Sequence, residues 1–436
     1  MNRRVGIERS TGLAGGGVVS AASQRNYEIG AELCRKRKPN EAAPYLLKAI
    51  EDHNNLDAFI ELSFLMPDWE SRLDVLATAA RNGQRLLEAR LGPNCFDDNG
   101  PYVGRFWEIL DTRPYMRVLQ AQVRLFFESG DYKSSAETII EMLRLCPGDN
   151  MNQRTWLGPL LCRLERYSDA LSFARFWIED FISDHTNYVP PYRGGTAFKV
   201  PERKLFSPED EKNVDSSPCS MTYTAALAAF KLWGDCEESR QYLRVASKGN
   251  PHVMIKVLGR INRPEQMNMN PRGWNGPEDA HDYLWLVQDL WMNDDVWNWA
   301  NEHPEAKGAT FKKCAKPSCT LKETRAAEFQ RCSSCHLVSY CSQACQKDDW
   351  KRHKPDCQFH KMKKAAVQAF NAGKAAPEGC TIPIFATDFS GGAVHLYDGN
   401  QATVNGVPIP DPGTASASAS KKKKKNKKKN KKPEGN

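Results

Sequence analysis

The sequence lacks several features that would place it in a common class of protein. Its 436 residues contain no run of 18 apolar side chains, so no segment is predicted to cross a membrane as a helix. The start of the chain combines Arg3 and Arg4 with a glycine-rich stretch that is too broken for the apolar part of a secretion signal. P-loop, G-x-G-x-x-G, G-x-S-x-G and H-E-x-x-H motifs are also absent. We therefore expect a soluble chain without these catalytic signatures. Residues 1–24 are predicted to be a disordered N-terminus, with a weak mitochondrial presequence as the alternative.

Positive charge is scarce in most of the chain, although the net charge is +8. Residues 1–306 carry a net charge of −7, and residues 365–420 carry −3. Two short regions reverse this sign, because residues 307–364 and residues 421–436 each carry +9. Any binding of a polyanion is therefore expected from the last third of the chain and not from its acidic body.

Strand-like alternation is rare over residues 25–300, where apolar residues instead recur at helical spacing. A small residue is followed by apolar residues four and seven positions later in four places, and these series begin at Ala42, Ser135, Ala170 and Ser239. Each series follows another apolar helical stretch, so the pattern predicts four helix pairs. Small residues would let paired helices approach closely, and the larger residues would fill the groove of the next pair.

At these residues the chain resembles the tetratricopeptide (TPR) repeat family, whose unit is a helix–turn–helix of about 34 residues. The resemblance implies a mainly α fold, with a TPR-like α-solenoid over residues 25–187 that continues through residues 219–306. It also implies a concave surface that binds a protein partner. The leading Trp of the family signature is missing, and an irregular α-bundle is the alternative.

Two features of the helical body have competing interpretations. The Pro/Gly-rich residues 188–218 are predicted to form an ordered loop, because Tyr188, Tyr192, Phe198 and Phe206 are interleaved through them. Disorder is the alternative. Four tryptophans, Trp285, Trp291, Trp297 and Trp299, are predicted to pack in the core of a helical cap rather than to form a ligand box.

Arg113 and Arg117 flank Pro114, which is typical of the first turn of a helix. These arginines are expected to form salt bridges within the chain. Anchoring of an acidic peptide by the two guanidinium groups is the alternative.

Half of the 14 cysteines fall within a short stretch near the C-terminal third, together with one histidine. The spacing is Cys314-x4-Cys319-x12-Cys332-x2-Cys335-x5-Cys341-x3-Cys345-x7-His353-x3-Cys357. Without a secretion signal, such clustering indicates metal binding in a reducing compartment rather than disulfides. Eight ligands in four pairs make two closed tetrahedral zinc sites, which favours a structural role over catalysis. A segment this short needs the metal to fold, and structural zinc supplies about 10–16 kcal/mol per site.

The run from Tyr340 to Cys357 closely resembles the MYND zinc finger, which covers residues 307–364 in the predicted domain organisation. By this resemblance, one Zn²⁺ is bound by Cys314, Cys319, Cys341 and Cys345, and the other by Cys332, Cys335, His353 and Cys357. Ser342 is a good N-cap for a helix over residues 343–351 that carries Cys345. The pattern leaves His336 and His360 out of the ligand set.

MYND fingers dock short Pro-rich peptides, often of the PxLxP type. Carried over by position, Gln346 and Trp350 would form the peptide-binding face, one turn apart on the short helix. The indole plane suits a proline ring, and the amide can bond to an extended backbone. The alternative is that Trp350 only packs against the zinc lobe.

The C-terminal region is predicted to be a weakly structured linker over residues 365–420 and a Lys-rich tail over residues 421–436. A small hairpin is possible around Ile384 and Leu396. Ten lysines in the tail repel one another and have nothing apolar to bury, so this block cannot fold. Its candidate roles are nuclear targeting, contact with RNA or DNA, and solubility.

Together these features predict a non-enzymatic, zinc-binding adaptor of the nucleus and/or cytoplasm, in which the finger and the helical repeats each bind a protein partner. One alternative is a nucleic-acid- or ribosome-associated factor that uses the basic finger and the Lys-rich tail. A weaker alternative is a relative of the SET-type lysine methyltransferases, which also carry MYND fingers. Here the repeats precede the finger, and no Asn-His-Ser-Cys-like SET segment is found.

Overall fold

The computed structural model describes residues 18–183, 189–214, 217–268, 274–335 and 337–371, together with four short strands further along the chain. These residues divide into two compact units. The first, the helical unit, contains the described residues up to Lys312 and also Glu323–Glu328. The second, the zinc-finger unit, contains Lys313–Lys322 and the described residues from Phe329 onward. Each unit is described separately below.

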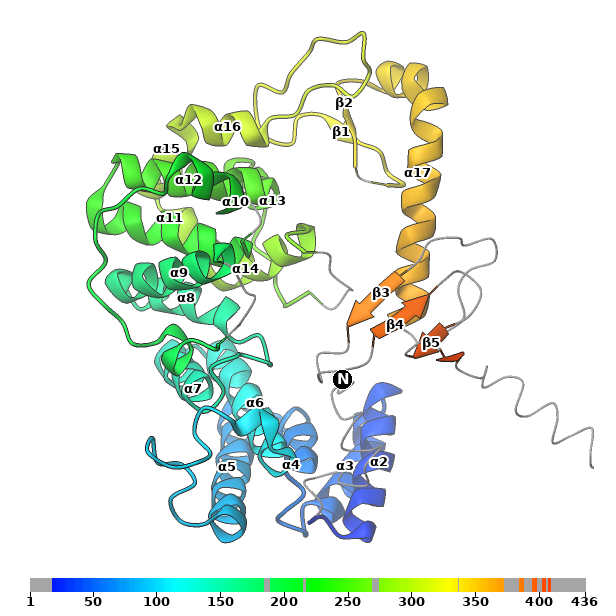
Figure 1. The fold of residues 1–436 in the computed structure, drawn as a ribbon. Coiled ribbons are helices and arrows are strands. Elements are labelled where there is room, and N and C mark those ends of the chain that lie inside the picture. The colour runs from blue at the N-terminus through cyan, green and yellow to red at the C-terminus, as the bar shows by residue number, and fades with distance from the viewer. Residues whose placement is uncertain are drawn as a thin grey trace, which may run out of the picture. The chain divides into compact units, whose positions relative to one another are not determined.

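The helical unit consists of α-helices joined mostly by short connections (Figure 1). Its α-helices are α2 (Ala21–Arg35), α3 (Pro39–Ala49), α4 (Leu56–Ser63), α5 (Trp69–Leu91), α6 (Arg113–Ser129), α7 (Tyr132–Leu145), α8 (Arg154–Arg163), α9 (Tyr167–Ile182), α10 (Pro208–Val214), α11 (Cys219–Trp233), α12 (Glu237–Gly249), α13 (Pro251–Leu258), α14 (Pro277–Trp291), α15 (Asp294–Glu302) and α16 (Pro304–Thr310). Single 3₁₀ turns lie at Phe106–Glu108, Leu110–Thr112 and Tyr192–Gly195. The mainly helical fold predicted from the sequence is therefore present.

Four helix pairs pack as hairpins where the apolar series predicted them: α2 with α3, α6 with α7, α8 with α9, and α11 with α12. Two or three residues connect the helices of each pair, which forces the partners to run back along one another. Neighbouring pairs are also in contact, since α7 packs on α8 and α9 packs on α11. Three of the four hairpins, α6–α7, α8–α9 and α11–α12, therefore stack on one another.

Small residues allow these helices to approach closely. Ser135, Ala170 and Ser239 are fully buried, and the Ser135 hydroxyl donates a hydrogen bond of 2.9 Å to the Val123 carbonyl. At Gly158 of α8, an added Cβ would lie 2.8 Å from the Thr224 methyl group of α11. Such contacts leave no room for a larger side chain at the helix crossing.

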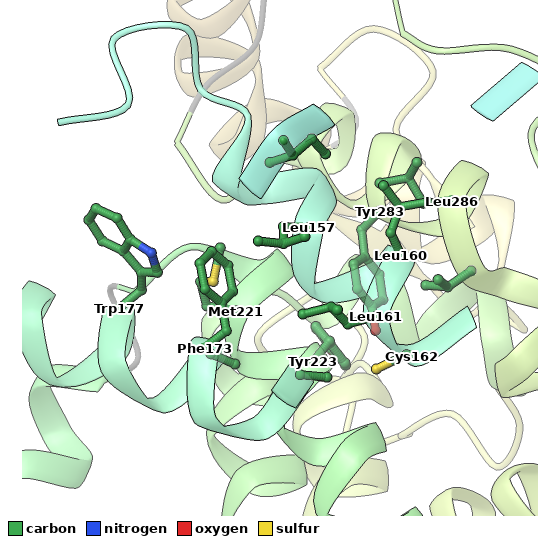
Figure 2. Close-up of a cluster of buried hydrophobic side chains, with 14 of the residues drawn as sticks. Leu157, Leu160, Leu161, Cys162, Phe173, Trp177, Met221, Tyr223, Tyr283 and Leu286 are labelled. Carbon is green, nitrogen blue, oxygen red and sulfur yellow. The ribbon is translucent and has the colours of Figure 1, made fainter. Parts of the chain in front are cut away.

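Buried apolar side chains from several helices form one large core. Figure 2 shows part of it, where α8, α9, α11 and α14 meet. Each large side chain in such a core contributes about 1.5–3 kcal/mol by leaving water. Trp285, Trp291 and Trp299 are buried, and Trp297 packs against the same core. The predicted packing role of these tryptophans is what the structure shows.

A buried ion pair links α4 to α6. The Arg117 guanidinium donates to both carboxylate oxygens of Asp57, at 2.7 and 2.6 Å, and both side chains are almost fully buried. Pro114 lies in the first turn of α6, and the Arg113 guanidinium donates to the Trp107 carbonyl at 3.0 Å. Arg117 therefore forms the predicted salt bridge within the chain, whereas the hydrogen bond of Arg113 is to a backbone carbonyl.

The Pro/Gly-rich segment is ordered over residues 189–214, and Tyr188 lies outside the described residues. The Trp177 indole donates to the Gly194 carbonyl at 3.1 Å, and the Arg193 guanidinium donates to Asp98 at 2.9 Å. Gly194 and Gly195 have φ angles of +60° and +80°, a left-handed backbone that suits glycine. The predicted ordered loop thus crosses α9 and reaches the connection between α5 and α6.

Two boundaries differ from those predicted. The N-terminal residues 1–24 were expected to be disordered, but α2 begins at Ala21, because the Ser20 hydroxyl accepts the Ser23 amide at 3.3 Å and caps it. The second difference concerns α17, which was expected over residues 343–351 but runs over Gln343–Asn371. The helix therefore extends past residue 365, where the linker was predicted to begin. Its added turns are rich in Lys and Ala, which favour helix and carry the chain past Pro355.

The zinc-finger unit contains α17, the two-stranded antiparallel sheet β1 (Gln330–Arg331) and β2 (Ser339–Tyr340), and a four-stranded antiparallel sheet in the order β3-β4-β5-β6. The latter strands are Ile384–Thr387, Val394–Tyr397, Ala402–Val404 and Val407–Pro408. The pair β3–β4 lies where the hairpin was predicted. Residues 421–436 lie outside the described residues. Within the described part of the chain, no helix is both long and apolar enough to span a membrane.

Candidate metal centre

Four cysteines from three separate segments form the first cluster. Cys314 and Cys319 lie in a loop that is closed by the antiparallel bridge between Lys313 and Lys322. Cys341 directly follows β2, and Cys345 lies in the first turn of α17. Their four sulfur atoms lie within 4.8 Å of one another. The Sγ atom of Cys341 is 3.7 Å from that of Cys319 and 3.5 Å from that of Cys345.

Three cysteines and a histidine form the second cluster, and all four are buried. Cys332 and Cys335 lie in the turn between β1 and β2, while His353 and Cys357 lie one turn apart on α17. The Sγ atoms of Cys332 and Cys357 are 3.8 Å apart, and the Cys335 Sγ is 3.3 Å from the His353 Nε2. The structure thus brings together all eight predicted ligands, in the two groups that the MYND resemblance implied.

The dimensions of both clusters suit tetrahedral zinc. A Zn–S bond of about 2.3 Å gives sulfur–sulfur edges of about 3.8 Å in a tetrahedron. The sulfur–sulfur distances of 3.5–3.8 Å in the two clusters lie close to this value. Each cluster offers four ligands of the soft or borderline type that Zn²⁺ prefers, which leaves no position for a substrate. The chain therefore fits two structural Zn²⁺ ions.

The protein surroundings favour thiolate at one cysteine of each cluster. Burial raises the pKa of the Cys314 thiol, but the backbone amides of Cys341 and Lys316 outweigh this effect and lower that pKa to about 7. In the second cluster burial likewise opposes ionisation of Cys332, while the Cys335 amide and the His353 side chain bring its pKa down to about 6. Hydrogen bonds to the charged form of sulfur cause both decreases.

The pKa values of two other cysteines, one in each cluster, are raised instead. Burial, followed by the proximity of other thiols, raises the pKa of Cys341 to about 12. For Cys335, burial and the nearby Cys332 raise the pKa to about 11. Three or four sulfur atoms this close cannot all carry charge without a cation between them, so a metal ion is needed to bring every cysteine of a cluster to the thiolate form.

A polar network centred on the buried carboxylate of Asp349 fixes α17 against β2 between the two clusters. The Tyr340 hydroxyl donates to Asp349 at 2.8 Å, and the Arg352 guanidinium donates to both oxygens of the same carboxylate, at 2.7 and 2.8 Å. These contacts, the Arg352 bond first, hold the pKa of Asp349 below its usual value. Arg352 also donates to the Ala315 carbonyl at 2.9 Å, which extends the network to the first zinc loop.

The first turn of α17 is capped as the sequence predicted, because the Ser342 hydroxyl accepts the Cys345 amide at 3.2 Å. Sequence reasoning assigned no structural role to Tyr340, Asp349 or Arg352, although all three lie inside the motif. Two features of the sequence could have indicated this network. One is the Tyr directly before the third ligand pair, and the other is the Asp and Arg three residues apart on the following helix. His336 lies outside the described residues, and His360 is half-buried on α17.

Gln346 and Trp350, the predicted peptide-binding pair, lie one turn apart on α17. Trp350 is 39% exposed, and its ring contacts His353 at a centroid separation of 6.0 Å. Gln346 is half-buried. The indole therefore packs beside a zinc ligand on one side and faces solvent on the other.

Residues 312–357 match the family model described as "MYND finger". This match and the two clusters identify a MYND-type zinc finger in the chain. Such fingers mediate protein–protein interaction. No solved structure matches the chain.

Several curated proteins share a short similar stretch with the chain. An F-box protein of Arabidopsis thaliana is 50% identical over 54 residues, which cover 12% of this chain and 14% of that protein. SET domain-containing protein 14 of Caenorhabditis elegans is 49% identical over 39 residues, 9% of each chain. SET domain and MYND-type zinc finger protein 6 of Schizosaccharomyces pombe is 33% identical over 67 residues, 15% of this chain and 12% of that protein. The chain thus spans 14% or less of the length of these relatives.

Proposed function

We propose that this protein is a non-enzymatic adaptor whose MYND finger docks a Pro-rich peptide of another protein. The observation that carries the proposal is the position of Trp350, which is partly exposed on a helix whose buried face is held in place by zinc ligands and the Asp349 network. A rigid, exposed indole with an amide one turn away suits an extended, proline-containing backbone. Preorganisation of this kind lowers the entropy lost on binding.

The hairpins of the helical unit are the proposed second docking surface. Their short connections, small buried residues at helix crossings and stacking of neighbouring pairs support a TPR-like arrangement. Repeats of this type present extended surfaces to protein partners. We place the adaptor in the nucleus and/or cytoplasm, where free thiols persist and bind metal.

The peptide proposal is tested by titrating the full-length, zinc-loaded protein into labelled PxLxP peptides and measuring fluorescence anisotropy. Trp350→Ala should weaken binding by tenfold or more, because a buried aromatic anchor typically contributes about 2 kcal/mol or more. Phe359→Ala is the matched control, since Phe359 is also an exposed aromatic residue of α17, at 55% exposure. Equal binding by the wild type and Trp350→Ala would remove the assigned role of the indole.

The proposal that the protein is not an enzyme has its own test. A methyl-donor analogue should leave the melting temperature of the protein unchanged, because a bound ligand stabilises a folded protein in proportion to its affinity. A clear increase in melting temperature would instead favour a methyltransferase. The SET-containing relatives make this the relevant ligand to try.

A second candidate function is binding of RNA or DNA, favoured by the net charge of +9 in each of residues 307–364 and 421–436. Binding through phosphate contacts would weaken steeply as salt concentration rises. Deletion of residues 421–436 should then abolish binding to a single-stranded oligonucleotide, measured at low salt. Unchanged binding would exclude the Lys-rich tail and point to the finger.

A further inference from the structure

Four lysines lie along one side of α17, which we call the lysine stripe: Lys347, Lys351, Lys354 and Lys361. At 100° per residue these positions fall within an arc of about 80° on the helix surface. All four side chains are exposed. In the described part of the chain, none of the four forms an ion pair, whereas Lys316 of the same unit pairs with Asp348 at 2.8 Å.

The lysine stripe runs beside the proposed peptide-binding pair. The buried face of α17 carries Asp349, His353 and Cys357, and its centre lies about 120° from the centre of the stripe. Trp350 lies midway between the two, about 60° from each. A peptide seated on the indole would therefore have the stripe along one edge.

The length of the stripe defines the length of a partner segment. Lys347 and Lys361 are 14 residues apart, which corresponds to about 21 Å along a helix. An extended chain covers this distance with about six residues, at 3.3–3.6 Å per residue. Carboxylates on such a segment would neutralise lysines that have no partner among the described residues.

The arrangement of aromatic residues favours a peptide over a single-stranded nucleic acid. Nonspecific single-strand sites combine positive charge with successive aromatic rings on which bases stack. Trp350 borders the stripe, but Phe359 lies about 120° from its centre, on another side of the helix. One indole beside a row of lysines suits a single anchoring side chain followed by an acidic run.

We propose that the lysine stripe of α17 binds an acidic segment of about six residues that flanks the Pro-rich motif on the same partner chain. This inference rests on the proposed peptide-binding function and specifies the class of peptide. Once the motif is seated on Trp350, the acidic flank is held at high effective concentration next to the lysines. Weak individual ion pairs can then add to affinity and to specificity.

The test compares three labelled peptides on the full-length, zinc-loaded protein: a PxLxP motif with a neutral flank, the same motif with six acidic residues, and the acidic flank without the motif. The acidic flank should strengthen binding of the motif about tenfold at low salt, and this gain should shrink as salt concentration rises. The triple variant Lys351→Glu, Lys354→Glu and Lys361→Glu should abolish the gain and leave the neutral-flank peptide unaffected.

The matched control reverses the same number of exposed charges outside the stripe and away from the zinc loops, with Lys199→Glu, Lys204→Glu and Lys363→Glu. It should retain the tenfold gain. A gain that survives in the stripe variant would belong to another basic segment, such as residues 421–436, and would overturn the inference. Equal binding of the neutral and acidic peptides would also overturn it while leaving the proposed function intact, whereas failure of every motif-containing peptide to bind would overturn both.

Discussion

At the residue scale, packing of the helical unit depends on positions where a side chain is small or missing. Gly158 is the clearest case, because the Thr224 methyl group occupies the space that a Cβ at residue 158 would need. The contact joins α8 to α11, which belong to neighbouring hairpins. Protein interiors are packed too tightly to absorb such an overlap without movement of the helices.

We expect Gly158→Ala to destabilise the helical unit by about 1–3 kcal/mol, since overpacking at a helix crossing exceeds the gain in helix propensity. Chemical denaturation of the wild type and the variant measures this free energy of unfolding. Gly308→Ala is the control, because an added Cβ there meets nothing within 4 Å. That change in α16 should be neutral or slightly stabilising.

The double variant Gly158→Ala, Thr224→Ser distinguishes overlap from other causes. Removing the Thr224 methyl group restores the space, so the double variant should recover most of the lost stability. If the losses in stability caused by the two substitutions simply add, the contact between residues 158 and 224 is not the cause of the destabilisation by Gly158→Ala.

In the zinc finger, the sequence predicted the roles of some residues but not of others. The eight ligands were predictable because a metal site imposes residue type and spacing directly on the chain. The bond from Tyr340 to Asp349 was not, because it joins two segments nine residues apart whose contact depends on how α17 lies on β2. Single-residue patterns carry no information about such a pairing until the fold is known.

At the scale of single elements, the conformation of segment 189–214 depends least on its own sequence and most on contacts with other helices. It contains one short helix, α10, whose Glu211 carboxylate accepts two hydrogen bonds from Arg244 of α12, at 2.7 and 2.8 Å. Arg244 also donates to Glu305 of α16 at 3.0 Å. One guanidinium thus connects three elements, and it holds the pKa of Glu211 at about 2.

Glu211→Gln should loosen this segment at neutral pH by about 1–3 kcal/mol without unfolding the helical unit, because a charged, partly buried pair is lost. Limited proteolysis should show faster cleavage within residues 189–214 than in the wild type. Glu209→Gln, a change at an exposed residue of the same helix, should leave the cleavage rate unaltered.

The same pair predicts a dependence on pH. Glutamate in an unfolded chain titrates near pH 4.3, above the folded value of about 2, so the pair stabilises the segment fully above about pH 5. Its contribution falls as the pH decreases from about 5 to 2. The protection of residues 189–214 against hydrogen exchange, corrected for the intrinsic pH dependence of amide exchange, should therefore decrease over this range in the wild type, and less so in Glu211→Gln.

Element boundaries were predicted less well than the presence of the elements. Apolar series identified the four hairpins because their periodicity extends over several turns. The end of α17 was placed too early, because the predicted helix over residues 343–351 continues to Asn371. Ordering of 189–214 depends on Trp177, Asp98 and Arg244, which come from distant parts of the sequence.

At the scale of the whole molecule, the division into two units separates two sources of stability. The helical unit buries a large apolar core, whereas the described residues of the finger form only small apolar clusters around its cysteines. The hydrophobic effect therefore stabilises the helical unit, and metal binding stabilises the finger.

Treatment with a strong chelator should therefore remove two Zn²⁺ per chain and unfold the finger, while the main thermal transition of the helical unit shifts by less than about 2 °C. Calorimetry and a colorimetric zinc assay measure both effects on one sample. Loss of the main transition together with the metal would show that the helical unit also depends on zinc.

The ligand pairs of the two clusters alternate along the chain, and this order has a consequence for synthesis. The first site needs Cys314 and Cys345, and the second needs Cys332 and Cys357, so the two sites enclose overlapping stretches of polypeptide. Neither can be completed by a growing chain until its C-terminal pair has left the ribosome. Up to that moment the nascent protein carries reactive thiols in incomplete pairs, which makes late metallation, with protection of those thiols from oxidation, part of the biogenesis of this finger.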